Sequence, residues 1–206
     1  MHTTLNAIRA HAPCTSGWAR LLRYLGKTEA DDGLLPILTI IDSNGLDDAL
    51  WCLRTVGGHD REIRLLGVAY ARRVQHLMYH PDSVAALDVA ERCAHGEATV
   101  EELAAARAAA WTVAWVAVRQ CVTPAAQAAE AAWAASVASS DASIMLASRL
   151  AATAAAAGVR AKVQPEAPGR AAVVAKRARA KERAAQGRLL REMLAASTVG
   201  RAMEQL

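Results

Sequence analysis

TVEELAAARAAAWTVAWVAV, residues 99–118, is the most informative stretch for the fold. In it a helix-start signal is followed by alanines and two tryptophans. Thr99 and Glu102 have the spacing of a capping box, in which each side chain accepts a hydrogen bond from the other residue's backbone N–H. Alanine has the highest helix propensity of all residues. We therefore predict a helix that begins at Thr99 and runs to about residue 122.

The tryptophans are the largest side chains of a chain that has no phenylalanine. Trp111 and Trp115 lie four residues apart and so share one side of the helix. A second helix is expected over residues 124–157 and carries Trp133. Because alanine lets two backbones approach closely while indoles fill the gaps, we predict an antiparallel hairpin over residues 99–157 with all three tryptophans buried. Burial would make Trp111→Ala cost about 3–5 kcal/mol. Alternatively, the tryptophans form a surface for a ligand or partner.

Residues 1–98 predict several short helices. Apolar residues recur at helical spacing in three segments, and glycine or proline follows each segment as a stop signal. These segments are 18–25, 46–53 and 60–78. No run alternates with a period of two residues, so no sheet is expected.

The whole pattern predicts an all-α protein of 206 residues. Short helices over residues 1–98 and the alanine-rich hairpin over 99–157 would form one domain, 1–157. A Gly/Pro-containing linker is expected over 158–170, followed by a basic helical segment over 171–206.

Charge is distributed unevenly along the chain. The net charge is +4, yet residues 160–191 contain ten basic and only two acidic residues. Like charges at helical spacing weaken an isolated helix, so an anionic group should compensate them. The candidates are an acidic face of this protein itself, an acidic protein partner, and nucleic acid. The residues predicted to bind such a partner are Lys176, Arg177, Arg179, Lys181, Arg183 and Arg188.

The basic segment favours a protein partner over nucleic acid. It contains no aromatic side chain that could stack on bases, and it matches no motif that reads DNA. Two alternatives stay open: the same cations contact phosphates, or the segment is a solvated helical tail that binds no partner.

The sequence contains no convincing catalytic or metal-binding motif. No serine or cysteine stands in a nucleophile-elbow context, and no catalytic residue is predicted. A zinc site built from His76, His80, Cys93 and His95 would support a metal-dependent enzyme, but the cysteine–histidine spacing fits no common zinc finger. We therefore expect no metal, no cofactor and no enzymatic activity.

The expected location is the cytoplasm of a bacterial cell. The first fourteen residues lack a basic start followed by an apolar run, so no secretory signal is expected. The alanine-rich stretches are too often interrupted by charges to predict a membrane span. The four cysteines are widely spaced, which is typical of reduced thiols rather than of a disulfide framework.

One stretch resembles a known protein family. GWARLLRYLGKTEADDGLLPILTIIDSNGLDDALWCLRTVGGHDREIRLLGVAYARRVQHLM, residues 17–78, is similar to proteins of tailed phages and prophages that are labelled immunity proteins. ALDVAERCAHGEATVEELAAARAAAW, residues 86–111, looks like the continuation of that family's pattern. The resemblance implies an all-α protein of phage origin and supplies no catalytic residues.

These observations lead to one hypothesis about function. We expect a non-enzymatic, helical, phage- or prophage-encoded protein that inhibits a partner protein by occlusion. It would act as an immunity protein against a toxin or as an inhibitor of a host defence system such as CRISPR interference. The alternative is a nucleic-acid-binding protein that uses the basic C-terminal helix.

Overall fold

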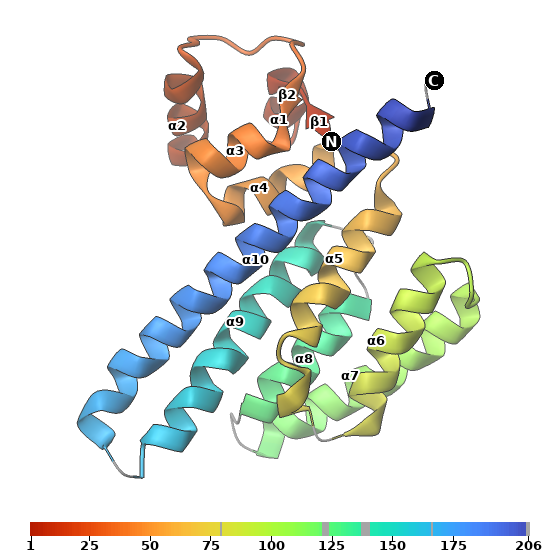
Figure 1. Ribbon diagram of the computed structural model, residues 1–206, viewed down its shortest axis with the longest axis vertical. Helices are drawn as coiled ribbons and strands as arrows, with labels where there is room; N and C mark the ends of the chain where they lie inside the picture. The colour runs from red at the N-terminus through yellow and green to blue at the C-terminus, as the bar shows by residue number, and fades with distance from the viewer. Residues whose placement is uncertain (79, 121–123, 137–140, 166, 205–206) are drawn as a thin grey trace. The chain divides into compact units, whose positions relative to one another are not determined.

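The computed structural model describes residues 1–78, 80–120, 124–136, 141–165 and 167–204 (Figure 1). Most of the described chain is helical, which confirms the predicted all-α class. One antiparallel pairing joins His2–Thr3 (β1) to Leu35–Pro36 (β2), so the expectation of no sheet is wrong at this point. Two residues per strand are too few to leave an alternating pattern in the sequence.

The described chain divides into two compact units. One unit comprises Met1–His59 and Gly187–Leu206, and the other comprises Asp60–Gln186. These limits differ from the predicted domains 1–157 and 171–206, because the last helix, α10 (Pro168–Glu204), contributes residues to both units.

The predicted linker over residues 158–170 is also wrong. Helix α9 (Asp141–Val163) includes Gly158, and α10 already begins at Pro168. A Cβ atom at Gly158 would lie 3.2 Å from a methyl carbon of Leu77, closer than side chains usually approach. This glycine therefore permits close packing inside a helix, whereas the sequence pattern had indicated the end of one.

The unit formed by Met1–His59 and Gly187–Leu206 contains four short α-helices and a 3₁₀ turn before the end of α10. They are α1 (Leu5–Ala10), α2 (Thr15–Leu25), α3 (Ile37–Asn44), α4 (Leu46–Cys52) and η1 (Leu53–Thr55). Aliphatic side chains from these elements and from α10 are almost fully buried, as expected for an independent core. The largest of them are Leu5, Ile8, Ile37, Ile40, Leu50, Leu53, Leu190 and Leu194.

The unit Asp60–Gln186 is built on the alanine-rich helices. Its elements are α5 (Asp60–Arg72), η2 (Gln75–Leu77), α6 (Pro81–Ala94), α7 (Val100–Gln120), α8 (Pro124–Ser136), α9 and the start of α10. The capping box is confirmed: Thr99 N donates to Glu102 Oε2 over 2.8 Å, and Glu102 N donates to Thr99 Oγ1 over 3.1 Å. The single helix expected over 124–157 is two helices, so the alanine-rich region forms three helices instead of a hairpin.

Helix α8 lies at the centre of this unit, in contact with α5, α6, α7 and α9. Five alanines of α8 have no exposed surface: Ala128, Ala131, Ala132, Ala134 and Ala135. A side chain of one methyl group lets a neighbouring backbone approach from several directions at once. The alanine-rich composition is thus explained by a helix that is packed on most of its circumference.

The predicted burial of the tryptophans is wrong for two of them. Trp111 is 48% exposed and Trp115 is 52% exposed, whereas Trp133 is partly buried and packs on the core. The side of α7 that faces the core consists of Leu103 and small residues, namely Ala110, Ala114 and Ala117. Close approach of α7 to its neighbours needs small side chains in the contact, so the indoles lie outside it, and Trp111 packs beside the contact against Trp133 of α8.

Candidate functional site

Five of the six predicted partner-binding cations are exposed side chains of α10: Lys176, Arg177, Arg179, Lys181 and Arg188. The first four lie within the unit Asp60–Gln186. The distance along the helix axis from Lys176 to Lys181 is about 8 Å. Among the residues that the structure describes, no acidic side chain forms an ion pair with any of these four. They form a dense positive surface, which we call the α10 cationic surface (Lys176, Arg177, Arg179 and Lys181).

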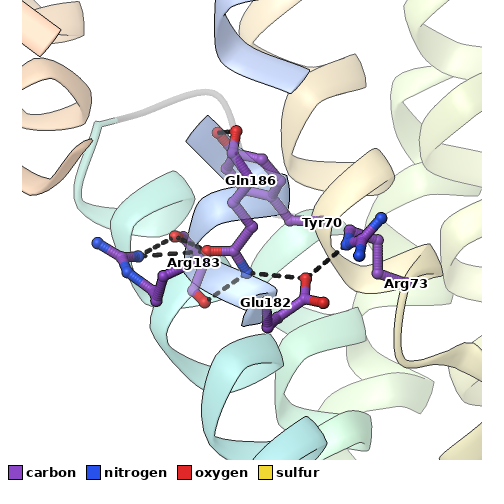
Figure 2. Close-up of polar contacts among 6 residues, drawn as sticks. Tyr70, Arg73, Glu182, Arg183 and Gln186 are labelled. Carbon is purple, nitrogen blue, oxygen red and sulfur yellow. Dashed lines mark hydrogen bonds and ion pairs between the residues drawn. The ribbon is translucent and has the colours of Figure 1, made fainter. Parts of the chain in front are cut away.

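The opposite side of α10 is held by polar side chains as well as by alanines. Gln186 is fully buried, and its amide nitrogen donates to the backbone carbonyl of Ser148 in α9 over 3.0 Å. The Ser148 hydroxyl donates to Gln186 Oε1 over 2.8 Å. Tyr70 of α5 donates its hydroxyl to the backbone carbonyl of Gln186 over 3.2 Å (Figure 2). Burial raises the pKa of Tyr70, so the phenol stays protonated and remains a donor at neutral pH.

An ion pair extends this buried cluster. Glu182 is only 7% exposed, and its carboxylate accepts a hydrogen bond from Arg73 Nε of α5 over 2.6 Å (Figure 2). Gln186 Nε2 lies 3.3 Å from the same carboxylate oxygen. A buried carboxylate needs such partners, because an unpaired charge in the interior is costly. The two contacts therefore fix the rotation of α10 about its own axis.

Arg183 differs from the other predicted partner-binding residues. It is partly buried, and its guanidinium donates to the Ser148 hydroxyl over 2.5 Å and to Gln186 Oε1 over 3.3 Å (Figure 2). These contacts place Arg183 in the cluster that joins α10 to α9. The sequence alone could not show that Arg183 is partly buried while the other cations are exposed, because all the cations of this helix have similar sequence neighbours.

Arg188 and Arg191 belong to the other unit. There Arg191 donates to Asp42 Oδ1 over 2.7 Å, so part of the positive charge on α10 is compensated within the chain. This observation agrees with one of the three expected sources of compensation, an acidic group of the protein itself. The Arg191–Asp42 ion pair does not compensate the charges of the α10 cationic surface.

Three of the four residues of the hypothetical zinc site contact other groups in the structure, and the fourth, His76, is exposed. His80 Nδ1 accepts the backbone N–H of Asp82, and His95 Nδ1 lies 3.1 Å from a guanidinium nitrogen of Arg61. Cys93 accepts a hydrogen bond from Arg64 over 3.4 Å. Within the described parts of the chain, no group of three His, Cys, Asp or Glu residues is placed to hold a metal ion. The expectation that the protein binds no metal stays a prediction.

Three cysteines, Cys14, Cys52 and Cys93, are free thiols, and Cys121 lies outside the described residues. Burial, with the nearby Asp48 carboxylate, raises the pKa of Cys52 to about 12. A thiol with that pKa is protonated at neutral pH and is a poor nucleophile.

A shallow hollow lies in the unit Asp60–Gln186 beside the C-terminal part of α9. It is lined by Pro124, Gln127, Thr153, Ala156, Ala157, Arg160, Ala161, Gln164 and Ala175. Two of its polar side chains have partners: Arg160 Nε lies 3.5 Å from Gln164 Oε1, and the Thr153 hydroxyl donates to Arg149 O. Gln127 Oε1 is buried and has no hydrogen-bond partner among the described residues. The lining combines no acid with a base or nucleophile, as general acid–base chemistry requires.

One helix among the described residues, α9 from Ile144 to Val163, is long and apolar enough to cross a membrane by length and composition. The same helix contributes Ala147, Ala151 and Ala154 to the core and contacts α5 and α8. Core helices meet the same criterion, so the expectation that the chain has no membrane span stays a prediction.

Comparison of this chain with protein-family models, with curated proteins and with solved structures finds no match.

Proposed function

We propose that this protein is a non-enzymatic helical inhibitor that binds an acidic partner protein through the α10 cationic surface. The observation that carries the proposal is the set of four exposed cations, Lys176, Arg177, Arg179 and Lys181, which have no anionic partner among the described residues. Charge of one sign concentrated on a helix steers and orients an oppositely charged partner.

The anchoring of α10 supports the same proposal. Glu182, Arg183 and Gln186 hold the inner side of the helix through Arg73, Ser148 and Tyr70. A surface on a rigid helix loses little conformational entropy when it binds, which favours affinity. The cost of crowding like charges is offset by these buried contacts.

The resemblance of residues 17–111 to immunity proteins of phages and prophages favours inhibition over other outcomes of binding. The protein would block a toxin or a host defence system such as CRISPR interference, in the cytoplasm of the host bacterium. Occlusion requires surface complementarity and no catalytic group, in keeping with the protonated Cys52 and the acid-free hollow.

The test compares the wild-type protein with a variant in which Lys176, Arg177, Arg179 and Lys181 are changed to glutamate. Arg183 is left unchanged because it belongs to the buried cluster. We expect capture of a host protein, quantified by mass spectrometry, to fall by about tenfold or more. A matched control changes four cations of the other unit, Arg9, Arg20, Arg23 and Lys27, to glutamate, and it should capture normally.

A second measurement distinguishes the nucleic-acid alternative. If the variant captures proteins normally and loses only a steeply salt-dependent affinity for generic duplex DNA, the α10 cationic surface binds phosphates and the inhibitor proposal is wrong. Inhibition itself is tested by expressing the protein in a bacterium with active CRISPR interference and plating a targeted phage. Restored plating by the wild type, and not by the variant, supports an anti-defence role; protection against a co-expressed toxin supports immunity.

A further inference from the structure

The exposed side of α7 carries a stripe of side chains with an unusual order. Its members follow one another at steps of three or four residues and therefore lie along one side of the helix. All six are exposed: Glu101, Ala104, Ala108, Trp111, Trp115 and Arg119. We call this set the α7 stripe. It begins with an acid, continues with two alanines and two tryptophans, and ends with a base.

The two tryptophans form a continuous apolar surface. Their ring centroids are 6.3 Å apart and the rings are nearly parallel, with 24° between the planes. Trp111 also contacts Trp133 of α8, with ring centroids 4.7 Å apart, so it is supported from beneath. Arg119 extends over Trp115, with 5.8 Å from its guanidinium carbon to the ring centroid. Half-exposed, mutually supported indoles are typical of the centre of an interface.

Two copies of the α7 stripe are complementary to each other when their helices run antiparallel. If two copies of α7 lie antiparallel about a two-fold axis near residue 110, Glu101 of one copy faces Arg119 of the other. Ala104 then faces Trp115, and Ala108 faces Trp111, in each half of the pairing. Every large side chain meets a small one and each acid meets a base, as an isologous interface demands.

We propose that the α7 stripe is a homodimer interface in which two copies of α7 pack antiparallel. The alanines leave room for the partner copy's indoles, and the two Glu101–Arg119 pairs set the register and direction. The contact from residue 101 to residue 119 is about 27 Å long. An interface made mainly by one helix pair is small, so the dimer dissociates in the micromolar range and forms reversibly.

The experiment measures self-association of the full chain by sedimentation velocity. Between about 1 and 300 µM, which brackets the affinities of small interfaces, the wild type should change from monomer to dimer. Trp115→Ala should raise the dissociation constant by about tenfold or more, because it removes two central indoles from the dimer. Circular dichroism should show that this variant stays folded, since Trp115 is half exposed.

A charge-reversal cycle supplies the specific test. Glu101→Arg and Arg119→Glu should each weaken the dimer by about tenfold, since each places like charges opposite each other at both ends. The double variant restores opposite charges and should recover affinity to within about threefold of the wild type. Glu192→Arg, an exposed reversal on α10, is the matched control and should leave the dissociation constant unchanged.

Three outcomes would overturn the proposal. A wild type that remains monomeric at the highest concentration has no such interface. A dimer that survives Trp115→Ala uses another surface. A double variant no better than the single variants shows that the two charges do not face each other, and a different antiparallel register or a different partner then occupies the α7 stripe.

Discussion

In helices α7 and α10, the burial of several side chains differs from what their residue types predict. In α7 the bulky tryptophans Trp111 and Trp115 are about half exposed, whereas Ala110 and Ala114 face the core. In α10 the polar Gln186 has no exposed surface, and the charged Glu182 is nearly as well buried. The difference lies in what each contact requires: α7 needs close approach of backbones, and α10 needs its inner polar groups to be satisfied.

Alanine can form the core face of a helix as effectively as leucine does. A helix with alanine on its inner side gains from many close backbone contacts, although each methyl group buries little area. A polar residue is tolerated inside only when each of its hydrogen-bonding atoms has a partner. Gln186 meets this condition through Ser148 and Glu182.

The largest effect should come from breaking the buried cluster of α10. Gln186→Met keeps the side-chain volume but removes one hydrogen bond each from the Ser148 hydroxyl, the Ser148 carbonyl and Glu182 Oε1. The hydroxyl and the carboxylate oxygen keep their hydrogen bonds from Arg183 and Arg73. We expect a loss of about 3 kcal/mol in the free energy of unfolding, measured by chemical denaturation. The control Gln164→Met, at an exposed position, should stay within about 0.5 kcal/mol of the wild type. A loss as small as the control's would mean that the cluster contributes no stability.

An intermediate effect should come from enlarging the inner side of α7. Ala114 is 1% exposed, so Ala114→Leu inserts three carbons where the neighbouring helix lies close. Overpacking of this kind should cost about 2 kcal/mol. Ala180→Leu, on the exposed side of α10, introduces the same side chain at no comparable cost. Equal unfolding free energies for the two variants would contradict the assignment of the α7 core face.

The smallest effect should come from the outer side of α7. Trp111→Ala removes an indole that is 48% exposed and that contacts Trp133 and the half-exposed Trp115. We expect a loss of about 1 kcal/mol, measured at low micromolar concentration, where the proposed dimer is dissociated. A loss of 3–5 kcal/mol would contradict the half-exposed position of Trp111 and would support the core position that its helical spacing predicts.

Much of the helical structure could be predicted because its signals are local. The capping box at Thr99 and Glu102 involves residues three apart, and Gly26 ends α2 with the positive φ that glycine favours. The exposure of the α10 cations also followed from their charge. The separate roles of Arg183 and of the other cations could not be predicted, because Ser148, which decides the difference, lies 35 residues away.

The sequence by itself determined the all-α class, the helix starts and the concentration of positive charge on α10, since each depends on neighbours within a few residues. Only the tertiary structure decided which side of α7 faces inward. An alanine-rich helix is weakly apolar on every side, so no stripe in the sequence marks the core face. The choice is made by how closely α8 and its neighbours approach, and large indoles are excluded where that distance is short.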